Sequence, residues 1–320
     1  MHAAVVRAFD TPPCYTTFAD PVAAEGELSV TVTAAGLHPI VKAMANGSHY
    51  GLKWELPFVP GVDGAGRLHD GTRVYFGISR SPYGTLAERA LAPNWMCIRL
   101  PEGVDDATAA GIVNPAMSSW AALMWRAQLV AGETVLVLGA TGVAGRLAVQ
   151  IAKRLGAGRV IAAGRNPQAL QALKELGADA VISLDQEHDP LVAAFRSEYA
   201  GAGLDVVLDY LWGRPAECVL EAISHKGLRK RASRLRFVQI GESAGGTLSL
   251  RAAALRSSGL ELLGSGLGSA SLDQLRAAVE EFFKIAVSEP FQFNVKTVSL
   301  SDVEALWERP EHGTRLVFQP

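Results

Sequence analysis

The sequence predicts an α/β protein that combines a doubly wound parallel sheet with a second, β-rich domain. Two observations support this prediction. From Glu133 onward, short apolar strand patterns alternate with helical patterns, as in consecutive βαβ units. Before about residue 115, short strand patterns are separated by Gly and Pro turns, which is typical of a small barrel. At 320 residues the chain is long enough for both domains.

The first strand of the alternating half ends in a turn of small residues. Val135–Leu138 is a short apolar run that fits a buried parallel strand, and Gly139-Ala140-Thr141-Gly142 follows it. A helical pattern begins at Val143. Strand, glycine turn and helix in this order are typical of a dinucleotide-binding unit. In such a unit Gly142 admits a pyrophosphate, and Gly145 lets the helix lie close to the strand.

The remaining elements follow the same alternation. The expected strands are Thr134–Leu138, Arg159–Ala163, Ala180–Ser183, Asp205–Leu208, Arg236–Ile240 and Leu260–Leu263, and the helices between them begin near Val143, Pro167, Pro190, Arg214 and Leu250. A helix over 271–287, a strand over 293–298, a short helix over 301–308 and a strand over 313–318 close the chain. We expect this last part to return to the β-rich domain. The expected domains are therefore 1–115 with 269–320, and 116–268.

The β-rich part is expected to contain several short strands and then two helices. Leu28–Val32, Gly71–Phe76 and Tyr83–Ala90 are the clearest strand patterns. Residues 105–112 are helix-prone, and a second helix is expected from Ser118. Pro115 predicts a break between these two helices.

Composition excludes several classes of function. The formal net charge of −2 offers no bulk attraction for nucleic acid, so we expect none as a partner. The basic cluster Arg229-Lys230-Arg231, Arg234 and Arg236 is interpreted as a solvated loop before a strand. Three cysteines far apart in sequence fit a reducing compartment. The first residues form a strand pattern and not a signal peptide, and no apolar run is long enough for a membrane span, which predicts a cytoplasmic protein.

A series of segments spread over nearly the whole chain is specific for one superfamily. The segments are Ala34–Pro39, Pro57–Gly66, Gly71–Val74, Ala131–Val137, Gly145–Ala157 and Leu176–Asp179. In this order they resemble the medium-chain dehydrogenase/reductase superfamily, and within it the zinc-independent quinone oxidoreductase branch. The resemblance implies a GroES-like barrel joined to a Rossmann domain, with NAD(P)H bound in the cleft between them.

The resemblance also predicts that no metal is bound. Zinc-dependent members have a cysteine where this chain has His38, and Gly-His-Glu where it has Gly61-Val62-Asp63. Their third catalytic ligand falls near Asn114, and their four-cysteine lobe is missing from this sequence. Tetrahedral zinc requires several convergent Cys or His ligands, and of that set a single histidine remains.

The residues after the second strand of the Rossmann half predict NADPH as the cofactor. NAD-specific sites have an Asp or Glu about 20 residues past the last fingerprint glycine, on the ribose 2′-OH. Arg165 stands at that position, 20 residues past Gly145. A guanidinium pairs with a 2′-phosphate, whereas a carboxylate repels it. Gly164 and Asn166 are expected to add donors; a solvated arginine in a turn is the alternative.

Three further cofactor contacts are implied by the resemblance. Gly241, after the expected strand 236–240, holds the nicotinamide amide in the family, and Ser265 belongs to the segment that covers the other side of the ring. Val143 stands where the quinone oxidoreductases usually have a second glycine, and we expect it to tighten the phosphate loop. The same branch usually has asparagine at the position of His38, so this histidine is expected to change substrate contacts.

Without a metal, a hydrogen-bond donor must polarise the acceptor oxygen. The candidates are Tyr50, His38 and Asn114, with Ser118 as a fourth, because all lie in segments that line the family's cleft. Each of them has a structural alternative; Asn114, for example, would cap a helix that begins after Pro115.

Three functions remain open from the sequence. The first is NADPH-dependent reduction of quinones, and the second is reduction of an enone, enal or enoyl double bond. The third is NADPH binding with little catalysis, as in a sensor, an RNA-binding protein or a structural component. In each case we expect a homodimer, because the late strand Leu260–Leu263 would form an apolar sheet edge, and the family often dimerises there.

Overall fold

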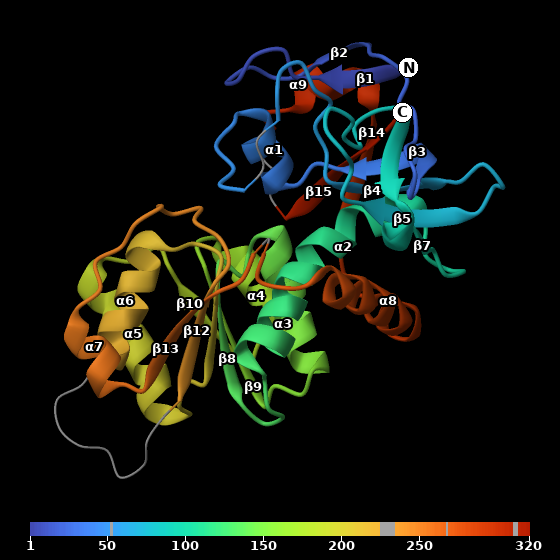
Figure 1. Ribbon diagram of the computed structural model, residues 1–320. Helices are drawn as coiled ribbons and strands as arrows, with labels where there is room; N and C mark the ends of the chain where they lie inside the picture. Colours follow the sequence, from blue (N-terminus) through green and yellow to red (C-terminus); the bar gives the residue numbers. More distant parts are fainter. Residues whose placement is uncertain (52–53, 225–233, 267, 310–312) are drawn as a thin grey trace. The chain divides into compact units, whose positions relative to one another are not determined.

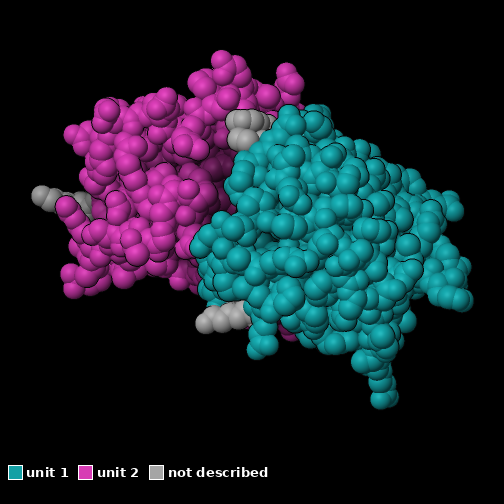
Figure 2. Space-filling view, turned by 90° about the horizontal axis from the view of Figure 1, so that it is seen from above, with its two compact units in different colours: residues 1–115, 272–320 teal, residues 116–271 magenta. Residues whose placement is uncertain are grey.

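The computed structural model describes residues 1–51, 54–224, 234–266, 268–309 and 313–320. The chain forms two compact units, which Figure 2 shows in different colours. Unit 1 contains residues 1–115 and 272–320, and unit 2 contains residues 116–271. The first boundary lies inside helix α2 (Asp106–Ala121), which begins in unit 1 and ends in unit 2.

Unit 2 is built around a six-stranded parallel sheet with the order β10-β9-β8-β11-β12-β13. Its strands are β8 (Thr134–Leu138), β9 (Arg159–Gly164), β10 (Ala180–Ser183), β11 (Val206–Asp209), β12 (Leu235–Gln239) and β13 (Leu260–Gly264). The chain fills one half of the sheet outward from β8 and then returns to β11, on the other side of β8. The strand order therefore reverses between β8 and β11, and ligands of such sheets bind at this switch point, beyond the carboxyl ends of the strands.

Helices cover both faces of this sheet (Figure 1). They are α3 (Val143–Arg154), α4 (Pro167–Glu175), α5 (His188–Gly201), α6 (Gly213–Ile223) and α7 (Ala252–Ser257). Apolar residues of α5 and α6, such as Phe195 and Val219, form a buried core with strand residues such as Leu136 and Phe237. The amphipathic α3 buries Leu147 and Ile151. These short apolar strands and one-sided helices are the doubly wound α/β architecture that the alternating patterns predicted.

Unit 1 contains a mainly antiparallel seven-stranded sheet and a two-stranded ribbon. The sheet has the order β14-β15-β3-β4-β5-β7, with β6 also paired to β3. Its strands are β3 (Glu27–Gly36), β4 (Asp63–Arg67), β5 (Arg73–Gly77), β6 (Arg89–Pro93), β7 (Ile98–Arg99), β14 (Asn294–Ser299) and β15 (Thr314–Gln319), and the ribbon is β1 (His2–Val5) with β2 (Cys14–Thr17). The other elements are α1 (Pro39–Ala45), α8 (Leu272–Ser288), α9 (Val303–Leu306) and the 3₁₀ turns η1 (Asn94–Met96) and η3 (Leu300–Asp302).

Strand β3 pairs with three different strands along its length. Its first half pairs with β6, its second half with β4, and its end with β15, with an irregularity between Val32 and Ala34. A strand that changes partners along its length lets a small sheet curl into a barrel. Because β15 pairs with β3, the last strand of the chain completes the sheet that β3 begins.

The predicted break at Pro115 is wrong. Helix α2 continues through this proline and passes into a π-helical turn, η2 (Ala122–Ala127). A proline inside a helix costs on the order of 3 kcal/mol, since it removes one hydrogen bond and crowds the carbonyl of the residue four before it. In α2 that residue is Gly111, and the helix buries Ala109, Ile112 and Val113. Burial of this apolar face outweighs the local penalty.

The expected strand over 83–90 is also displaced. The strand begins only at Arg89, and Tyr83 takes part in a single bridge to Val59. Backbone bonds from Gly84 to Val59 and from Leu86 to Pro60 tie the preceding segment to a loop instead. Among the described residues, none of the helices combines the length and the apolar character that crossing a membrane requires.

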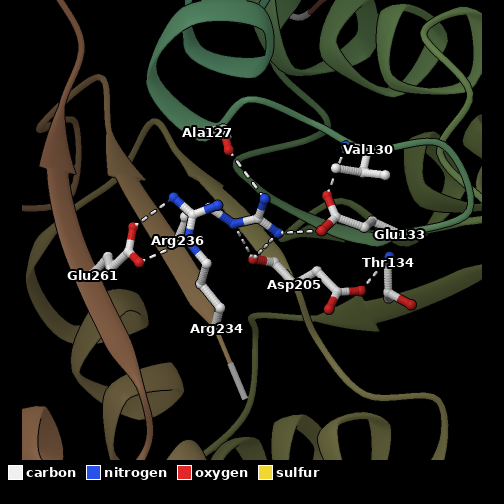
Figure 3. A network of polar contacts seen from close by, with 8 residues as sticks. All are labelled: Ala127, Val130, Glu133, Thr134, Asp205, Arg234, Arg236 and Glu261. Atoms are coloured by element: carbon white, nitrogen blue, oxygen red, sulfur yellow. Dashed lines mark hydrogen bonds and ion pairs between the residues drawn. The ribbon is translucent and has the colours of Figure 1, made fainter. Parts of the chain in front are cut away.

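A buried polar network closes the amino ends of the parallel strands (Figure 3). The guanidinium of Arg236, in β12, is 1% exposed and donates to the Ala127 carbonyl at 3.0 Å, to Glu133 Oε1 at 2.6 Å and to the Asp205 carbonyl at 3.1 Å. Asp205 and Glu133 in turn accept backbone N–H groups of Thr134 and Val130.

The interpretation of Arg236 as part of a solvated basic loop is therefore wrong. Its neighbour Arg234 is exposed and paired with Glu261, as expected for a surface residue. Residues 229–231 lie outside the described residues.

Candidate functional site

The predicted glycine turn lies directly at the switch point of the unit 2 sheet. The backbone N–H groups of Gly139 and Ala140 both donate to the Ala163 carbonyl of β9, at 3.0 and 2.9 Å. Gly139 has a φ of +85°, which glycine adopts without strain. Gly142 is the N-cap of α3, and no side chain caps this helix. The first-turn N–H groups of α3 are therefore not used by a capping side chain, and they carry the positive end of the helix dipole.

Gly145 and Gly142 have different roles in this turn. A Cβ on Gly145 would overlap the Gly139 carbonyl oxygen and come within 2.6 Å of Ala140 Cα. A Cβ on Gly142 would approach only the Gly139 oxygen, at 3.4 Å, which is an ordinary contact. Gly145 is thus required for close packing of the helix on the turn, whereas Gly142 leaves an exposed backbone. Val143, next to it, is buried and faces the core.

The turn after β9 carries the residues expected to choose between NADPH and NADH. Arg165 is exposed, and no ion pair joins it to another described residue. Gly164 packs against Thr141, whose Cγ2 would lie 2.5 Å from an added Cβ. Asn166 caps α4, because its Oδ1 accepts the Ala169 N–H at 2.8 Å. The structure thus brings Thr141 of the glycine turn beside the segment that carries Arg165.

A buried aspartate organises the turn after β11, on the other side of the switch point. Asp209 is fully buried, and its Oδ1 accepts the N–H groups of Leu211 and Trp212 at 2.8 and 3.0 Å. Its Oδ2 has no hydrogen-bond partner among the described residues. Burial raises the pKa of this carboxyl to about 6, against a smaller lowering by the two N–H groups. Trp212 has a φ of +58°, a backbone conformation that residues other than Gly rarely adopt.

Gly241 and Ser265 follow the next two strand ends. The N–H of Gly241 donates to the Asp209 carbonyl at 3.1 Å, and the N–H of Ser265 donates to the Gln239 carbonyl at 2.9 Å. Both residues therefore lie at the carboxyl edge of the sheet, as does the glycine turn. A surface hollow of about 350 Å³ opens beside them, lined by Trp212, Gln239, Glu242, Gly246, Leu262, Leu263 and Gly264.

His38, predicted as a catalytic residue in unit 1, is buried. Its Nε2 lies 3.1 Å from Asp63 Oδ1, and both side chains are less than 5% exposed. Tyr75 donates to the other oxygen of Asp63 at 2.7 Å. Burial, together with the nearby Asp63 charge, holds the pKa of Tyr75 well above its usual value. The Tyr75 hydroxyl satisfies Asp63 Oδ2, whereas both ring nitrogens of His38 and the Oδ1 of Asp63 are buried without a hydrogen-bond partner among the described residues, although Nε2 and Oδ1 lie within ion-pair distance.

The other catalytic candidates differ in exposure. Tyr50 is 72% exposed and stacks on His49, with ring centroids 4.6 Å apart. Asn114 is half-buried in the interior of α2, so it caps no helix, contrary to the alternative drawn from Pro115. Ser118 Oγ lies 3.1 Å from the hydroxyl of Tyr210, which follows Asp209.

Two residues of this site, Asp209 and Tyr210, were not recognised from the sequence. The expected strand ended one residue before Asp209, which hid the usual signal of an acidic residue at the carboxyl end of a parallel strand. Among the described residues, no group of three or more His, Cys, Asp or Glu side chains is arranged to hold a metal ion.

Comparisons with known proteins agree with this architecture. Residues 144–284 match the family model described as zinc-binding dehydrogenase. The chain is 28% identical to a probable NADPH-dependent quinone reductase of Emericella nidulans, over 100% of both proteins. It is 29% identical to a chloroplastic NADPH-dependent alkenal/one oxidoreductase of Arabidopsis thaliana, over 51% of this chain and 46% of that protein.

Solved structures extend the likeness to three dimensions. The quinone oxidoreductase of Thermus thermophilus, known also in complex with NADPH, is 29% identical and superposes with a TM-score of 0.77 over 100% of both chains. The likeness therefore spans both units, beyond the segment that the family model matches.

Proposed function

We propose that the chain is a member of the quinone oxidoreductase-like branch of the medium-chain dehydrogenase/reductase superfamily, and that it is an NADPH-dependent oxidoreductase that reduces quinones. The observation that carries the proposal is the carboxyl edge of the unit 2 sheet. There, a glycine turn at the switch point precedes α3, which has no side-chain cap at its N-terminus. The exposed Arg165 follows the neighbouring strand β9. The relatives named as NADPH-dependent reductases support the choice of cofactor.

The residues at this edge fit NADPH, which supplies a hydride when bound. The N–H groups of Ala140 and Gly142 already donate to the Ala163 and Gly139 carbonyls, so these two residues would shape the turn beside the pyrophosphate. The Thr141 backbone and the first-turn N–H groups of α3 would bind the pyrophosphate, with Val143 and Gly145 fixing the helix against the turn. Arg165 would pair with the 2′-phosphate, supported by Gly164. Asn166 already caps α4 through its Oδ1, so only its amide nitrogen remains to donate. Gly241 and Ser265 would flank the nicotinamide.

The acceptor is proposed to be a conjugated carbonyl compound. Such an acceptor spreads incoming charge onto a remote oxygen, where one hydrogen-bond donor suffices. Of the three catalytic candidates, Tyr50 is favoured because it is exposed, whereas His38 is fully buried beside Asp63. Asn114 remains a second candidate. Tyr50→Phe should lower turnover modestly, since a hydrogen bond of this kind contributes on the order of 1–3 kcal/mol.

A screen of NADPH oxidation with a panel of quinones, enones and simple alcohols tests this proposal. We expect turnover on quinones and little oxidation of ethanol or benzyl alcohol. Rapid alcohol oxidation without turnover on quinones or enones would contradict it.

Reduction of carbon–carbon double bonds is the second candidate. It is favoured by the similarity to the alkenal/one oxidoreductase of Arabidopsis thaliana. An α,β-unsaturated carbonyl makes the same demands on hydride position and on the donor as a quinone does. Higher turnover on enones than on quinones in the same panel would favour this function, and tight NADPH binding without turnover on either would favour a binding role.

We propose that catalysis needs no metal. The chain has His38, Val62 and Asp63 where zinc ligands would be expected, and His38 is paired with Asp63. The described side chains therefore do not form a tetrahedral site. Prolonged chelation should leave activity unchanged, and a stoichiometric amount of tightly bound zinc would contradict this.

We also propose that the protein is a cytoplasmic homodimer. Strand β13 is the last strand of the unit 2 sheet, and its Leu262 is 39% exposed. An apolar edge of this kind favours pairing with a second copy. The free thiols of Cys14, Cys97 and Cys218 fit a reducing compartment. A monomer mass in light scattering at micromolar concentration would contradict the dimer.

A further inference from the structure

The turn after β11 connects the two segments of unit 2 that are expected to hold opposite parts of the cofactor. On one side, Leu211 Cδ2 would lie 3.0 Å from a Cβ on Gly139, the first residue of the glycine turn. On the other side, the Leu211 carbonyl accepts the N–H of Ala244 at 2.8 Å, in the segment that follows Gly241. The turn therefore borders both the pyrophosphate turn and the proposed nicotinamide segment.

Asp209 holds this turn with one of its two carboxylate oxygens. Its Oδ1 accepts the N–H groups of Leu211 and Trp212. In the sheet, Asp209 is the register partner of Leu138, the residue directly before the glycine turn. Its carbonyl accepts the N–H of Gly241 at 3.1 Å. Asp209 thus lies beside the first residues of both cofactor segments.

The second oxygen of this carboxylate has no hydrogen bond. Asp209 Oδ2 is buried without a partner among the described residues, which disfavours the ionised form, and burial raises the pKa of the carboxyl to about 6. A pyrophosphate bound at the adjacent turn would add negative charge at a site of low dielectric, where like charges repel strongly. The protonated carboxyl avoids this repulsion, and its Oδ1 still accepts both N–H groups.

Neighbouring side chains do not compensate the charge of Asp209. Its register partners on β8 and β12 and the α2 partner of Tyr210 are uncharged; they are Leu138, Gln239 and Ser118. The ionisable groups of the adjoining segments are Tyr210, Arg146, Arg214 and Glu242. Burial raises the pKa of Tyr210 to about 12, so its phenol stays neutral. The shift of Asp209 itself comes from burial and from its two N–H partners, and not from these groups.

We propose that the dinucleotide binds preferentially to the protein in which Asp209 is protonated, so that cofactor binding takes up a proton at Asp209 Oδ2. The proton comes from solvent, and no other bond forms or breaks. By linkage, protonation strengthens cofactor binding by the same factor as the cofactor strengthens protonation. Affinity therefore falls as the pH rises through the titration of this carboxyl. The inference rests on the proposed function and adds a pH dependence to the same site.

The test compares the native protein with Asp209→Asn, which keeps an acceptor for the two N–H groups and carries no charge. Dissociation constants are measured by titration at about pH 5 and about pH 8 with NADP⁺, which has the pyrophosphate of NADPH and is stable in acid. We expect the native protein to lose roughly fivefold or more affinity relative to the variant over this interval, so that the variant binds more tightly at the higher pH. Titration of the ligand's own 2′-phosphate is common to both proteins and cancels in the comparison.

Asp205→Asn is the matched control. Asp205 precedes the same strand at its amino end, where its Oδ2 accepts the Thr134 N–H, so this variant should show the native pH dependence. A second measurement needs no variant: calorimetry of the native protein with NADH, which lacks the 2′-phosphate, in two buffers of different ionisation enthalpy. Near the titration of Asp209 it should show uptake of protons on binding.

Parallel pH dependence of affinity in the native protein and Asp209→Asn would overturn the inference alone, as would weaker binding by this variant at the higher pH. Absence of proton uptake with NADH would do the same if a variant fails to fold, which thermal unfolding at both pH values reveals. If the native protein binds no dinucleotide at either pH, the proposed function fails and the inference with it.

Discussion

The two ends of the parallel sheet in unit 2 differ in how fully their buried charged groups are hydrogen-bonded. At the amino ends, Arg236 is buried and fully engaged with Glu133, Asp205 and the Ala127 carbonyl (Figure 3). At the carboxyl ends, Asp209 is equally buried, yet one of its oxygens has no hydrogen-bond partner among the described residues. Trp212 has a positive φ at the same end, and α3 begins without a side-chain cap.

This difference indicates that the amino ends of the strands mainly stabilise the fold, whereas the carboxyl ends mainly bind ligands. The buried guanidinium of Arg236 connects the strands to the end of η2 through its hydrogen bonds. Each of its nitrogens has a partner within the protein, so the network has no group available to bind a ligand. Unsatisfied polar groups and strained backbone cost free energy, and they persist where binding or catalysis requires them. We therefore expect changes at the amino ends to alter the free energy of unfolding alone, whereas changes at the carboxyl ends affect the groups around the cofactor site, in some cases together with stability.

The largest effect is expected from Arg236→Met. Removing the guanidinium leaves the Glu133 carboxylate without its charged partner, and breaking a buried pair costs roughly 3–5 kcal/mol of unfolding free energy. Urea unfolding measures this loss, and NADPH affinity at low urea should remain native. Arg234→Met is the control: its pair with Glu261 is exposed, so stability should change little. Equal losses of unfolding free energy in the two variants would show that the buried network of Arg236 stabilises the protein no more than the exposed pair of Arg234 does.

Asp209 should make stability depend on pH. The pKa of its carboxyl is raised to about 6 from an ordinary 3.8, so the folded protein binds this proton more tightly than the unfolded chain does. Its contribution to stability is therefore present below about pH 4 and lost as the pH rises to about 6, by up to roughly 3 kcal/mol. Asp209→Asn removes this titration. Urea unfolding between pH 4 and 7 should then show a smaller decrease for the variant than for the native protein, whereas parallel curves would refute the assignment.

Arg165→Ala should change cofactor choice without changing stability. Loss of a charged hydrogen-bond donor to the 2′-phosphate should weaken NADPH by on the order of 1.5–3 kcal/mol and leave NADH unaffected. Titration of both cofactors measures the difference. Equal weakening of NADPH and NADH would show that Arg165 acts on something other than the 2′-phosphate.

The smallest effect is expected from Gly145→Ala, which tests the glycine turn. The added Cβ would overlap the Gly139 carbonyl, and overpacking of this kind costs typically about 1–3 kcal/mol. The turn should shift, so NADPH affinity should fall with stability. Gly142→Ala is the matched control, because its Cβ has room beside the Gly139 oxygen, and its stability should stay near native. A stable Gly145→Ala variant with native affinity would contradict the role given to close packing.

The sequence predicted the fold class well because strand and helix periodicities are local signals. Strands 134–138 and 180–183 have the expected bounds, and α3 begins at Val143 as expected. The prediction of a helix break at Pro115 was wrong because the local rule for proline does not include the stabilisation that α2 gains by burying its apolar face. The prediction that Arg236 is solvated was wrong because it was based on charge alone. Glu133 and Ala127, two of the partners that allow its burial, lie more than a hundred residues away in the sequence.

The site was only partly predictable for the same reason. The glycine turn and Arg165 follow a spacing rule within one βαβ unit, so they could be named from the sequence. Tyr210 and Ser118 are 92 residues apart, and their contact depends on how α2 meets the sheet. His38 was named as a catalytic candidate, but its pairing with Asp63 depends on the barrel, which brings the residue before α1 beside the first residue of β4.

Cofactor affinity of the native protein tests the central claim most directly. If the carboxyl edge of unit 2 is an NADPH site with Arg165 at the 2′-phosphate, titration at moderate ionic strength should show NADPH bound roughly tenfold or more tightly than NADH. Equal affinity for the two cofactors, or no binding of NADPH, would contradict the account.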